Sequence, residues 1–242
     1  MFESIHFESG GRRTTNASRP DVLDRLRAIV GEENVVVDPE RVEPYGADAV
    51  KEKFPPEVVV FPATTAEMAA ILKLANEVVF PVTARGGGVG YTGGAVPVEG
   101  GIVIGTDRMK QIIEINVDDL YITCQPGLTT FEVQQAAAEV GLMFAPDPAS
   151  YKDSYIGGNI AENAGGMRTP KYGVTKHHVL GLEVVTAQGD IIRTGGRTVK
   201  NVVGFDLTGL MCGSEGMLGI ITEATLKLLP MPEATSTVRA NF

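Results

Sequence analysis

Residues 85–94, which read Arg-Gly-Gly-Gly-Val-Gly-Tyr-Thr-Gly-Gly, decide the fold, with six glycines in ten positions. They directly follow a short apolar run at 79–84. Glycine has no Cβ, so it adopts positive φ readily and lets several N–H groups converge on an anion. Ordering so many glycines costs conformational entropy. A phosphate or pyrophosphate held by several N–H groups would offset that cost, so the stretch predicts a nucleotide- or flavin-binding protein.

The residues after this stretch exclude two common phosphate-binding motifs. Gly88, Gly90 and Gly93 have the spacing of the Gly-x-Gly-x-x-Gly fingerprint, but that fingerprint opens a helix. Residues 95–101 read Ala-Val-Pro-Val-Glu-Gly-Gly and cannot form a helix of useful length. No Gly-Lys-Ser or Gly-Lys-Thr occurs in the chain, which excludes a Walker loop. For this segment taken alone, a tight loop between strands that binds nothing remains the alternative.

The residues before the glycine stretch predict a βαβ unit. An apolar strand is expected at 58–61 and a second one at 79–84. Between them, Thr64 and Glu67 form the pattern of a capping box that opens a helix. Strands joined by such a helix are expected to be parallel.

The other expected elements define an α+β fold. Ser18 is a candidate cap and Pro20 suits the first turn of a helix that ends at Gly31. Thr129 and Glu132 predict a second capping box. Further strands are expected at 102–105, 112–117, 121–125 and 223–229, and a hairpin joins 182–187 to 190–194 through Gln188-Gly189. We expect a loose leader at 1–17, then a domain at 18–233 with a small lobe at 18–100 and a larger one at 101–233.

Two more segments are rich in glycine and small residues, at 157–166 and 213–219. Each alone is a weak signal, because glycines also serve helix–strand packing. Three such segments separated by regular elements are better explained by one elongated ligand that contacts all three.

Composition narrows the classes of partner. A net charge of −9 argues against nucleic acid as a partner, because nucleic-acid-binding proteins present a basic surface. No apolar run approaches the length of a membrane span and the first residues do not form a secretory signal, so a cytoplasmic protein is expected. Cys124 and Cys212 lack metal-binding spacing and are expected to be buried thiols, and no metal site is expected.

The order of these motifs carries a resemblance to a known family. The motifs are RGGGVGYTGG (85–94), QPG (125–127), PDP (146–148), GGNIAENAGG (157–166), KYG (171–173) and GSEGMLGIITE (213–223). Together they resemble the flavin-binding half of FAD-linked oxidases of the p-cresol methylhydroxylase and vanillyl-alcohol oxidase type. Within that type they are most similar to the glycolate oxidase D subunit and to FAD-dependent D-lactate and D-2-hydroxyglutarate dehydrogenases. The resemblance implies a two-lobed α+β FAD-binding domain.

The resemblance also implies cofactor contacts. Residues 85–94 would surround the FAD pyrophosphate, and Gly216 and Ile221 would pack near the adenine. The ribityl chain and isoalloxazine would be lined by residues 146–148, Gly157, Gly158, Asn163, Gly165 and Gly166. The implied contacts in full are Arg85, Gly86, Gly87, Gly88, Val89, Gly90, Thr92, Gly93, Gly94, Pro126, Gly127, Pro146, Asp147, Pro148, Gly157, Gly158, Asn163, Gly165, Gly166, Tyr172, Gly173, Gly216 and Ile221.

Two departures from the family pattern are informative. Relatives that attach FAD covalently carry a histidine where this chain has Val89, so the resemblance implies non-covalent FAD. In the family a substrate domain with a histidine cluster and a carboxylate-binding arginine follows, and residues 234–242 would be its start. The three histidines, His6, His177 and His178, match none of that cluster, and His177-His178 is expected in a surface or backbone-bonding role.

No catalytic residue can therefore be assigned, and two readings stay open. The chain is either the FAD-binding part of an oxidoreductase for a small 2-hydroxy acid, incomplete for catalysis alone, or a non-catalytic flavin-binding subunit of a multi-subunit oxidase. Both imply a catalytic or electron-transfer partner subunit, through which the protein could associate peripherally with a membrane.

Overall fold

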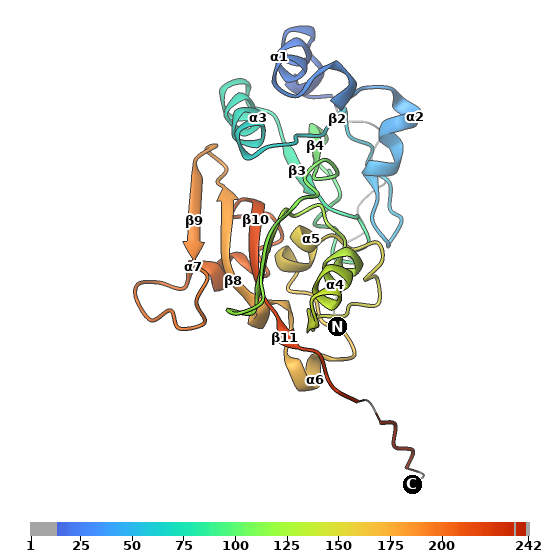
Figure 1. Cartoon of the computed structure of the whole chain (residues 1–242). Helices are drawn as coiled ribbons and strands as arrows, with labels where there is room; N and C mark the ends of the chain where they lie inside the picture. The colour runs from blue at the N-terminus through green and yellow to red at the C-terminus, as the bar shows by residue number, and fades with distance from the viewer. Residues whose placement is uncertain (1–13, 235, 241–242) are drawn as a thin grey trace, which may run out of the picture.

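The computed structural model describes residues 14–234 and 236–240. Residues up to β11 form two α+β lobes, one above the other in Figure 1, and the segment after β11 extends away from them. The first lobe has a four-stranded sheet of order β1-β2-β4-β3. Its strands are β1 (Val35–Val36), β2 (Val58–Val60), β3 (Val82–Arg85) and β4 (Ile102–Gly105). Its helices are α1 (Pro20–Val30), α2 (Pro39–Val42) and α3 (Thr65–Val78), with 3₁₀ helices at η1 (Asn16–Ser18), η2 (Glu32–Asn34) and η3 (Glu43–Gly46).

The central strands of this sheet are buried on both faces. Val58 and Val60 of β2 pack into the core under α1 and α3, whereas Val59 packs on the other face with Val42 of α2. Such continuous apolar runs are typical of parallel strands covered on both sides. The expected βαβ unit is confirmed: β2 and β3 both run parallel to β4, which lies between them.

Two boundaries and one capping box in this lobe differ from the sequence-based expectation. β3 begins at Val82, since Val79 adopts a left-handed φ of 62° as the C-cap of α3 and cannot continue a strand. Thr64 accepts from the Glu67 N–H, but the Glu67 carboxylate accepts from the N–H of Ala63, so the capping box is only half formed. The first sheet also extends beyond residue 100, because β4 is one of its inner strands.

The start of the chain is partly ordered. Ser18 does not cap α1; its hydroxyl donates to Glu57 at 2.6 Å, and the N-cap is Arg19 without a side-chain bond. Ala17 is fully buried and the Thr15 N–H donates to Glu57 at 2.7 Å, so residues 14–17 pack on the first lobe instead of forming a loose leader. The remainder of the expected leader, 1–13, lies outside the described residues, as do positions 235 and 241–242 of the expected further domain.

The second lobe has a five-stranded antiparallel sheet of order β5-β6-β10-β8-β9. Its strands are β5 (Ile112–Asn116), β6 (Tyr121–Cys124), β8 (Val179–Val185), β9 (Ile191–Gly195) and β10 (Ile220–Lys227). β7 (Leu142–Met143) and β11 (Leu229–Pro230) form a separate antiparallel pair. The helices are α4 (Thr130–Glu139), α5 (Ile156–Ala161), α6 (Thr169–Tyr172) and α7 (Leu207–Met211), with the 3₁₀ helix η4 (Thr175–His178). The second capping box and the β8–β9 hairpin are as expected.

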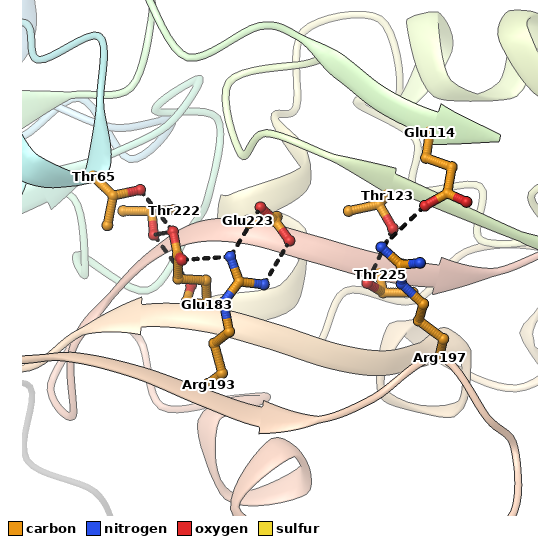
Figure 2. Close-up of polar contacts among 9 residues, drawn as sticks. All are labelled: Thr65, Glu114, Thr123, Glu183, Arg193, Arg197, Thr222, Glu223 and Thr225. Atoms are coloured by element: carbon orange, nitrogen blue, oxygen red, sulfur yellow. Dashed lines mark hydrogen bonds and ion pairs between the residues drawn. The ribbon is translucent and has the colours of Figure 1, made fainter.

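One face of this sheet is apolar and the other is polar. The apolar face packs on α4 and α5 and includes Cys124, a free buried thiol as expected. On the opposite face, Arg193 pairs with Glu183 at 2.6 Å and with Glu223 at 3.0 Å (Figure 2). The Thr65 hydroxyl donates to Glu183 at 2.6 Å, so this network ties the start of α3 to the second sheet (Figure 2).

The two lobes also share apolar packing. Val185, at the end of β8, and Ile220, at the start of β10, belong to the buried cluster of the first lobe. In addition, the Asn76 side chain on α3 donates to the carbonyl of Ala187 at 2.5 Å. The interface between the lobes is therefore part of the hydrophobic core.

Candidate functional site

A cleft lies where the glycine stretch faces α5 and the turn before β10. It encloses about 870 Å³, including the open space at its mouth. Sequence-predicted residues on its wall are Arg85, Gly86, Gly87, Gly88, Val89, Gly90, Gly94, Pro126, Gly157, Gly158, Gly216 and Ile221. All three glycine-rich segments therefore meet at one cleft.

The glycine stretch leaves β3 at Arg85 and returns to the sheet at β4. A Cβ on Gly87 would collide with the carbonyl oxygen of Asp153, so only glycine allows this close approach. Gly88 has a φ of +66°, and a Cβ there would collide with the Arg85 guanidinium. The density of glycine thus follows from close backbone packing together with an unusual backbone conformation.

Several main-chain donors on the cleft wall have no partner in the described part of the chain. The N–H groups of Gly87, Gly88 and Gly90 donate to no other described residue, and the same holds for Gly158 on α5. By contrast, the Gly93 N–H donates a hydrogen bond to the Asp48 carboxylate at 2.9 Å. Backbone donors that lack a protein acceptor are suited to the oxygens of an anionic ligand.

The Arg85 side chain fixes the position of the glycine stretch through hydrogen bonds to backbone carbonyls. Its guanidinium donates to the carbonyl oxygens of Ala95 at 3.3 Å, Pro44 at 3.4 Å and Tyr45 at 3.5 Å. Only 9% of the residue is exposed, and this burial lowers the pKa of the guanidinium from its usual value. The arginine therefore holds the glycine stretch against residues 44–45 while contributing one edge of the cleft.

The opposite wall is built on α5. Gly157 donates its N–H to the Pro126 carbonyl at 2.9 Å, and a Cβ there would lie 2.7 Å from the Pro126 ring. Apart from its chain neighbours and the backbone of its own helix, a Cβ on Gly158 would meet no atom of the described residues within 4 Å, because this position faces the open cleft. Asn159, buried behind them, donates to the Thr130 hydroxyl at 2.5 Å and fixes α5 against α4.

Tyr155 contributes a polar group that the motif patterns do not indicate. Its hydroxyl donates to Asp107 at 3.0 Å, and the Lys110 ammonium lies 5.0 Å from its ring centroid. Burial, then the nearby Asp107 carboxylate, raises the pKa of Tyr155 to about 12. The phenol is therefore a neutral hydrogen-bonding group at physiological pH.

Two carboxylates, Glu162 and Glu215, also lie on the wall. A Cβ on Gly90 would collide with the Glu162 carboxylate, and a Cβ on Gly94 would lie 3.0 Å from Glu215 Oε2. Both carboxylates therefore pack directly against the glycine stretch. Burial, followed by the charges of Glu215 and Asp48, raises the pKa of Glu162. Sequence patterns missed both acids, although each sits inside a quoted glycine motif. The other unexpected wall residues are Ala84, Ala95, Thr106, Ser150, Ser154, Tyr155, Asn159, Ala161, Ala164 and Ile220.

The remaining sequence-predicted residues lie off the cleft wall. They are Thr92, Gly93, Gly127, Pro146, Asp147, Pro148, Asn163, Gly165, Gly166, Tyr172 and Gly173. Their contacts are mostly supportive: Asp147 accepts from the Arg168 N–H at 2.9 Å, and Asn163 accepts from the Lys176 N–H at 2.9 Å. Asp147 and Asn163 therefore stabilise the chain segments before and after α6.

His178 has the backbone-bonding role expected for it. It is 3% exposed, and its Nε2 lies 3.0 Å from the Tyr172 carbonyl oxygen, so this nitrogen carries the proton. Burial lowers the pKa of the imidazole. Within residues 14–234 and 236–240, no group of three or more His, Cys, Asp or Glu could hold a metal ion, and no helix is long and apolar enough to cross a membrane.

Comparison with known proteins identifies the family. Residues 56–195 match the FAD binding domain. The chain belongs to this family. It is 46% identical over 223 residues to the glycolate oxidase subunit GlcD of Bacillus subtilis (strain 168), covering 92% of this chain and 47% of that protein. It is 47% identical over 173 residues to the D-lactate dehydrogenase of Archaeoglobus fulgidus, covering 72% of this chain and 39% of that protein. The chain thus spans about half the length of the curated relatives it matches.

Solved structures agree on the fold. An alkyldihydroxyacetonephosphate synthase superimposes with a TM-score of 0.80 at 22% identity, over 96% of this chain and 43% of that one. p-Cresol methylhydroxylase does so with a TM-score of 0.73 at 24% identity, over 88% and 43% of the two chains. The expected family, the p-cresol methylhydroxylase-type fold and FAD as the cofactor are therefore confirmed. The cleft residues fit FAD, since N–H groups without an acceptor among the described residues suit its phosphates and the missing Cβ at Gly158 keeps that part of the wall open.

Proposed function

We propose that this chain is the FAD-binding part of an oxidoreductase that acts on a small 2-hydroxy acid of the glycolate or D-lactate type. The observation that carries the proposal is the meeting of three glycine-rich segments at one cleft with unpartnered N–H donors. The substrate class follows from the relatives, which include a glycolate oxidase subunit and a D-lactate dehydrogenase. When bound, FAD supplies the two-electron acceptor for such an oxidation.

The proposal assigns roles to the cleft residues. The N–H groups of Gly87, Gly88 and Gly90 bind the pyrophosphate, and the turn at Gly216 and Ile221 packs near the adenine. Residues Gly157 and Gly158 leave space for the ribityl chain and the ring system. The flavin is held without a covalent bond, because Val89 offers no nucleophile at the place where covalent relatives have histidine.

The groups that grip and deprotonate the substrate come, in this proposal, from polypeptide outside these 242 residues. Among the described residues, the cleft wall carries neither histidine nor lysine, and its one arginine, Arg85, is committed to three carbonyl oxygens. The wall therefore offers no cationic clamp for a substrate carboxylate. The same observation supports the second candidate function, a flavin-carrying subunit that performs no chemistry itself and assembles with a catalytic or electron-transfer subunit.

The test begins with flavin content. The purified chain, or the chain refolded with FAD, is expected to show a flavin spectrum, and acid is expected to release all of that flavin. A protein that stays colourless with excess FAD would overturn both candidate functions. A Gly87→Val variant, whose side chain would collide with the Asp153 carbonyl, is expected to lose the flavin.

Anaerobic mixing with glycolate or D-lactate then separates the candidates. Bleaching of the flavin only after a partner subunit is added supports the first function. Bleaching by the chain alone would show that it carries its own substrate-binding groups, and would overturn the assignment of those groups to other polypeptide. An intact flavin spectrum in the presence of every tested partner and substrate supports the non-catalytic subunit.

A further inference from the structure

The net charge of the cleft wall is negative, as is the charge of FAD, so the wall repels the cofactor. Among the described residues that line it, the ionisable side chains besides Tyr155 are Arg85, Glu162 and Glu215. Arg85 points its guanidinium at carbonyl oxygens of residues 44, 45 and 95. FAD brings a pyrophosphate with two negative charges, so two acids face a dianion with one committed cation nearby.

The position of Glu162 makes it the acid of greater consequence. It follows the last residue of α5, and its carboxylate touches the backbone of Gly90 in the middle of the glycine stretch. Gly90 is also one of the residues whose N–H has no acceptor in the described chain. A phosphate bound to that N–H would therefore lie close to the Glu162 carboxylate.

No cation among the described residues neutralises Glu162. Its side chain forms no hydrogen bond or ion pair with any of them. The ionisable groups around it are Glu215 from the turn before β10 and Asp48 from the segment before β2, whose charges both act on it, and Arg85 at the end of β3, which lies on the same cleft wall. Two of these three are acids, which already disfavour a charge on Glu162 before any ligand binds.

We propose that Glu162 sets the affinity for FAD by taking up a proton when the dinucleotide binds. The pyrophosphate adds two negative charges beside the carboxylate, so the bound state favours the neutral acid, which also gains a proton to donate to a phosphate oxygen. The proton comes from solvent and no covalent bond changes. By linkage, FAD must then bind more tightly as the pH falls. This inference rests on FAD occupying the cleft with its pyrophosphate at the glycine stretch, as proposed above.

The test uses the full chain stripped of flavin. Calorimetric titration with FAD in two buffers of different ionisation enthalpy counts the protons taken up, and quenching of flavin fluorescence gives the Kd between about pH 6 and pH 8. For the wild-type protein we expect proton uptake and a Kd that falls by up to about tenfold for each unit decrease in pH. For Glu162→Gln we expect no linked uptake and, at about pH 8, a Kd about tenfold lower than that of the wild type.

Two further variants sharpen the assignment. Glu139→Gln changes an exposed acid on α4 away from the cleft wall and is expected to keep the wild-type pH profile. Glu215→Gln removes a like charge beside Glu162, so the pH at which the Kd changes is expected to move down while the proton uptake remains. Circular dichroism of each variant confirms that the fold is retained.

Several outcomes would overturn the inference. A wild-type Kd that does not vary with pH would do so, as would a Glu162→Gln variant that binds FAD more weakly at every pH, because the carboxylate would then be a hydrogen-bond acceptor for cofactor hydroxyls. If no variant and no wild-type sample bound FAD at any pH, the proposed function itself would fail, and this inference with it.

Discussion

Gly158 offers a substitution that separates folding from cofactor binding. It lies within the short helix α5 on the cleft wall, and a Cβ placed on it meets no atom within 4 Å among the described residues beyond its chain neighbours and helix backbone. Gly158→Ala should therefore fit the cofactor-free protein without displacing a neighbour. Its methyl group would project into the space that the proposed site reserves for FAD.

The two effects have opposite signs and can be sized separately. Replacing a helical glycine by alanine stabilises a fold by roughly 0.5–1 kcal/mol, since alanine loses less backbone entropy. For a chain of this length, that gain corresponds to a rise in Tm of about 1–4 °C. An extra methyl group forced against a bound ligand costs about 1–3 kcal/mol, which weakens the Kd for FAD by roughly 5- to 150-fold.

Thermal unfolding of the flavin-free protein and fluorescence titration with FAD measure the two effects. Gly196→Ala is the matched control, because a Cβ there also meets nothing within 4 Å while the position lies off the cleft wall. The control is expected to leave the Kd unchanged. A Gly158→Ala protein with a raised Tm and a wild-type Kd would refute the reasoning, since FAD could then not lie against α5.

Three other outcomes are expected. Burial raises the pKa of the Cys124 thiol to about 12 and that of the Cys212 thiol to about 11. A thiolate-selective reagent at about pH 8 should therefore label both cysteines only in denaturant, and rapid labelling of the native protein would contradict this. The pKa of His178 is lowered from 6.5, so the unfolded chain binds a proton at a higher pH than the folded protein does, and the free energy of unfolding should fall as the pH drops below 6.5. In urea unfolding at about pH 5 and pH 7, the His178→Gln variant should lose less free energy of unfolding between the two pH values than the wild type. Val79 is β-branched, 75% exposed and left-handed, so Val79→Gly should raise the free energy of unfolding by about 0.5–1 kcal/mol, and a lower value would show that the strain is absent.

Most of the regular elements could be predicted because their signals are local. Residues 102–105 coincide with β4, since three apolar side chains followed by glycine and bounded by turn residues are typical of a buried strand. Residues 79–81 looked equally strand-like but are not in β3. There the Asn16 side chain donates to the carbonyls of Val78 and Val79, at 3.1 and 3.4 Å, and a contact across more than sixty residues leaves no local pattern.

Most of the glycines on the cleft wall could be predicted from the sequence, but most of its polar side chains could not. The three glycine-rich segments all reach the cleft, because close backbone approach demands glycine and is visible in composition. Glu162 and Tyr155 also reach it, but whether a polar residue faces a cleft depends on how α5 is turned. Asp147 and Asn163 came from the resemblance; both lie off the cleft wall and accept from backbone N–H groups of neighbouring segments, and their contact with the cofactor stays a prediction.

The shared packing of Val185 and Ile220 has a mechanical consequence. Both come from the five-stranded sheet yet are buried in the core of the first lobe, so removing either lobe would leave the other with an exposed apolar cavity. The lobes should therefore unfold in a single cooperative transition, and neither should be stable as a separate fragment. Rotation of one rigid lobe against the other would expose Val185 and Ile220 to water, so the shared core holds the two walls of the cleft at a fixed spacing.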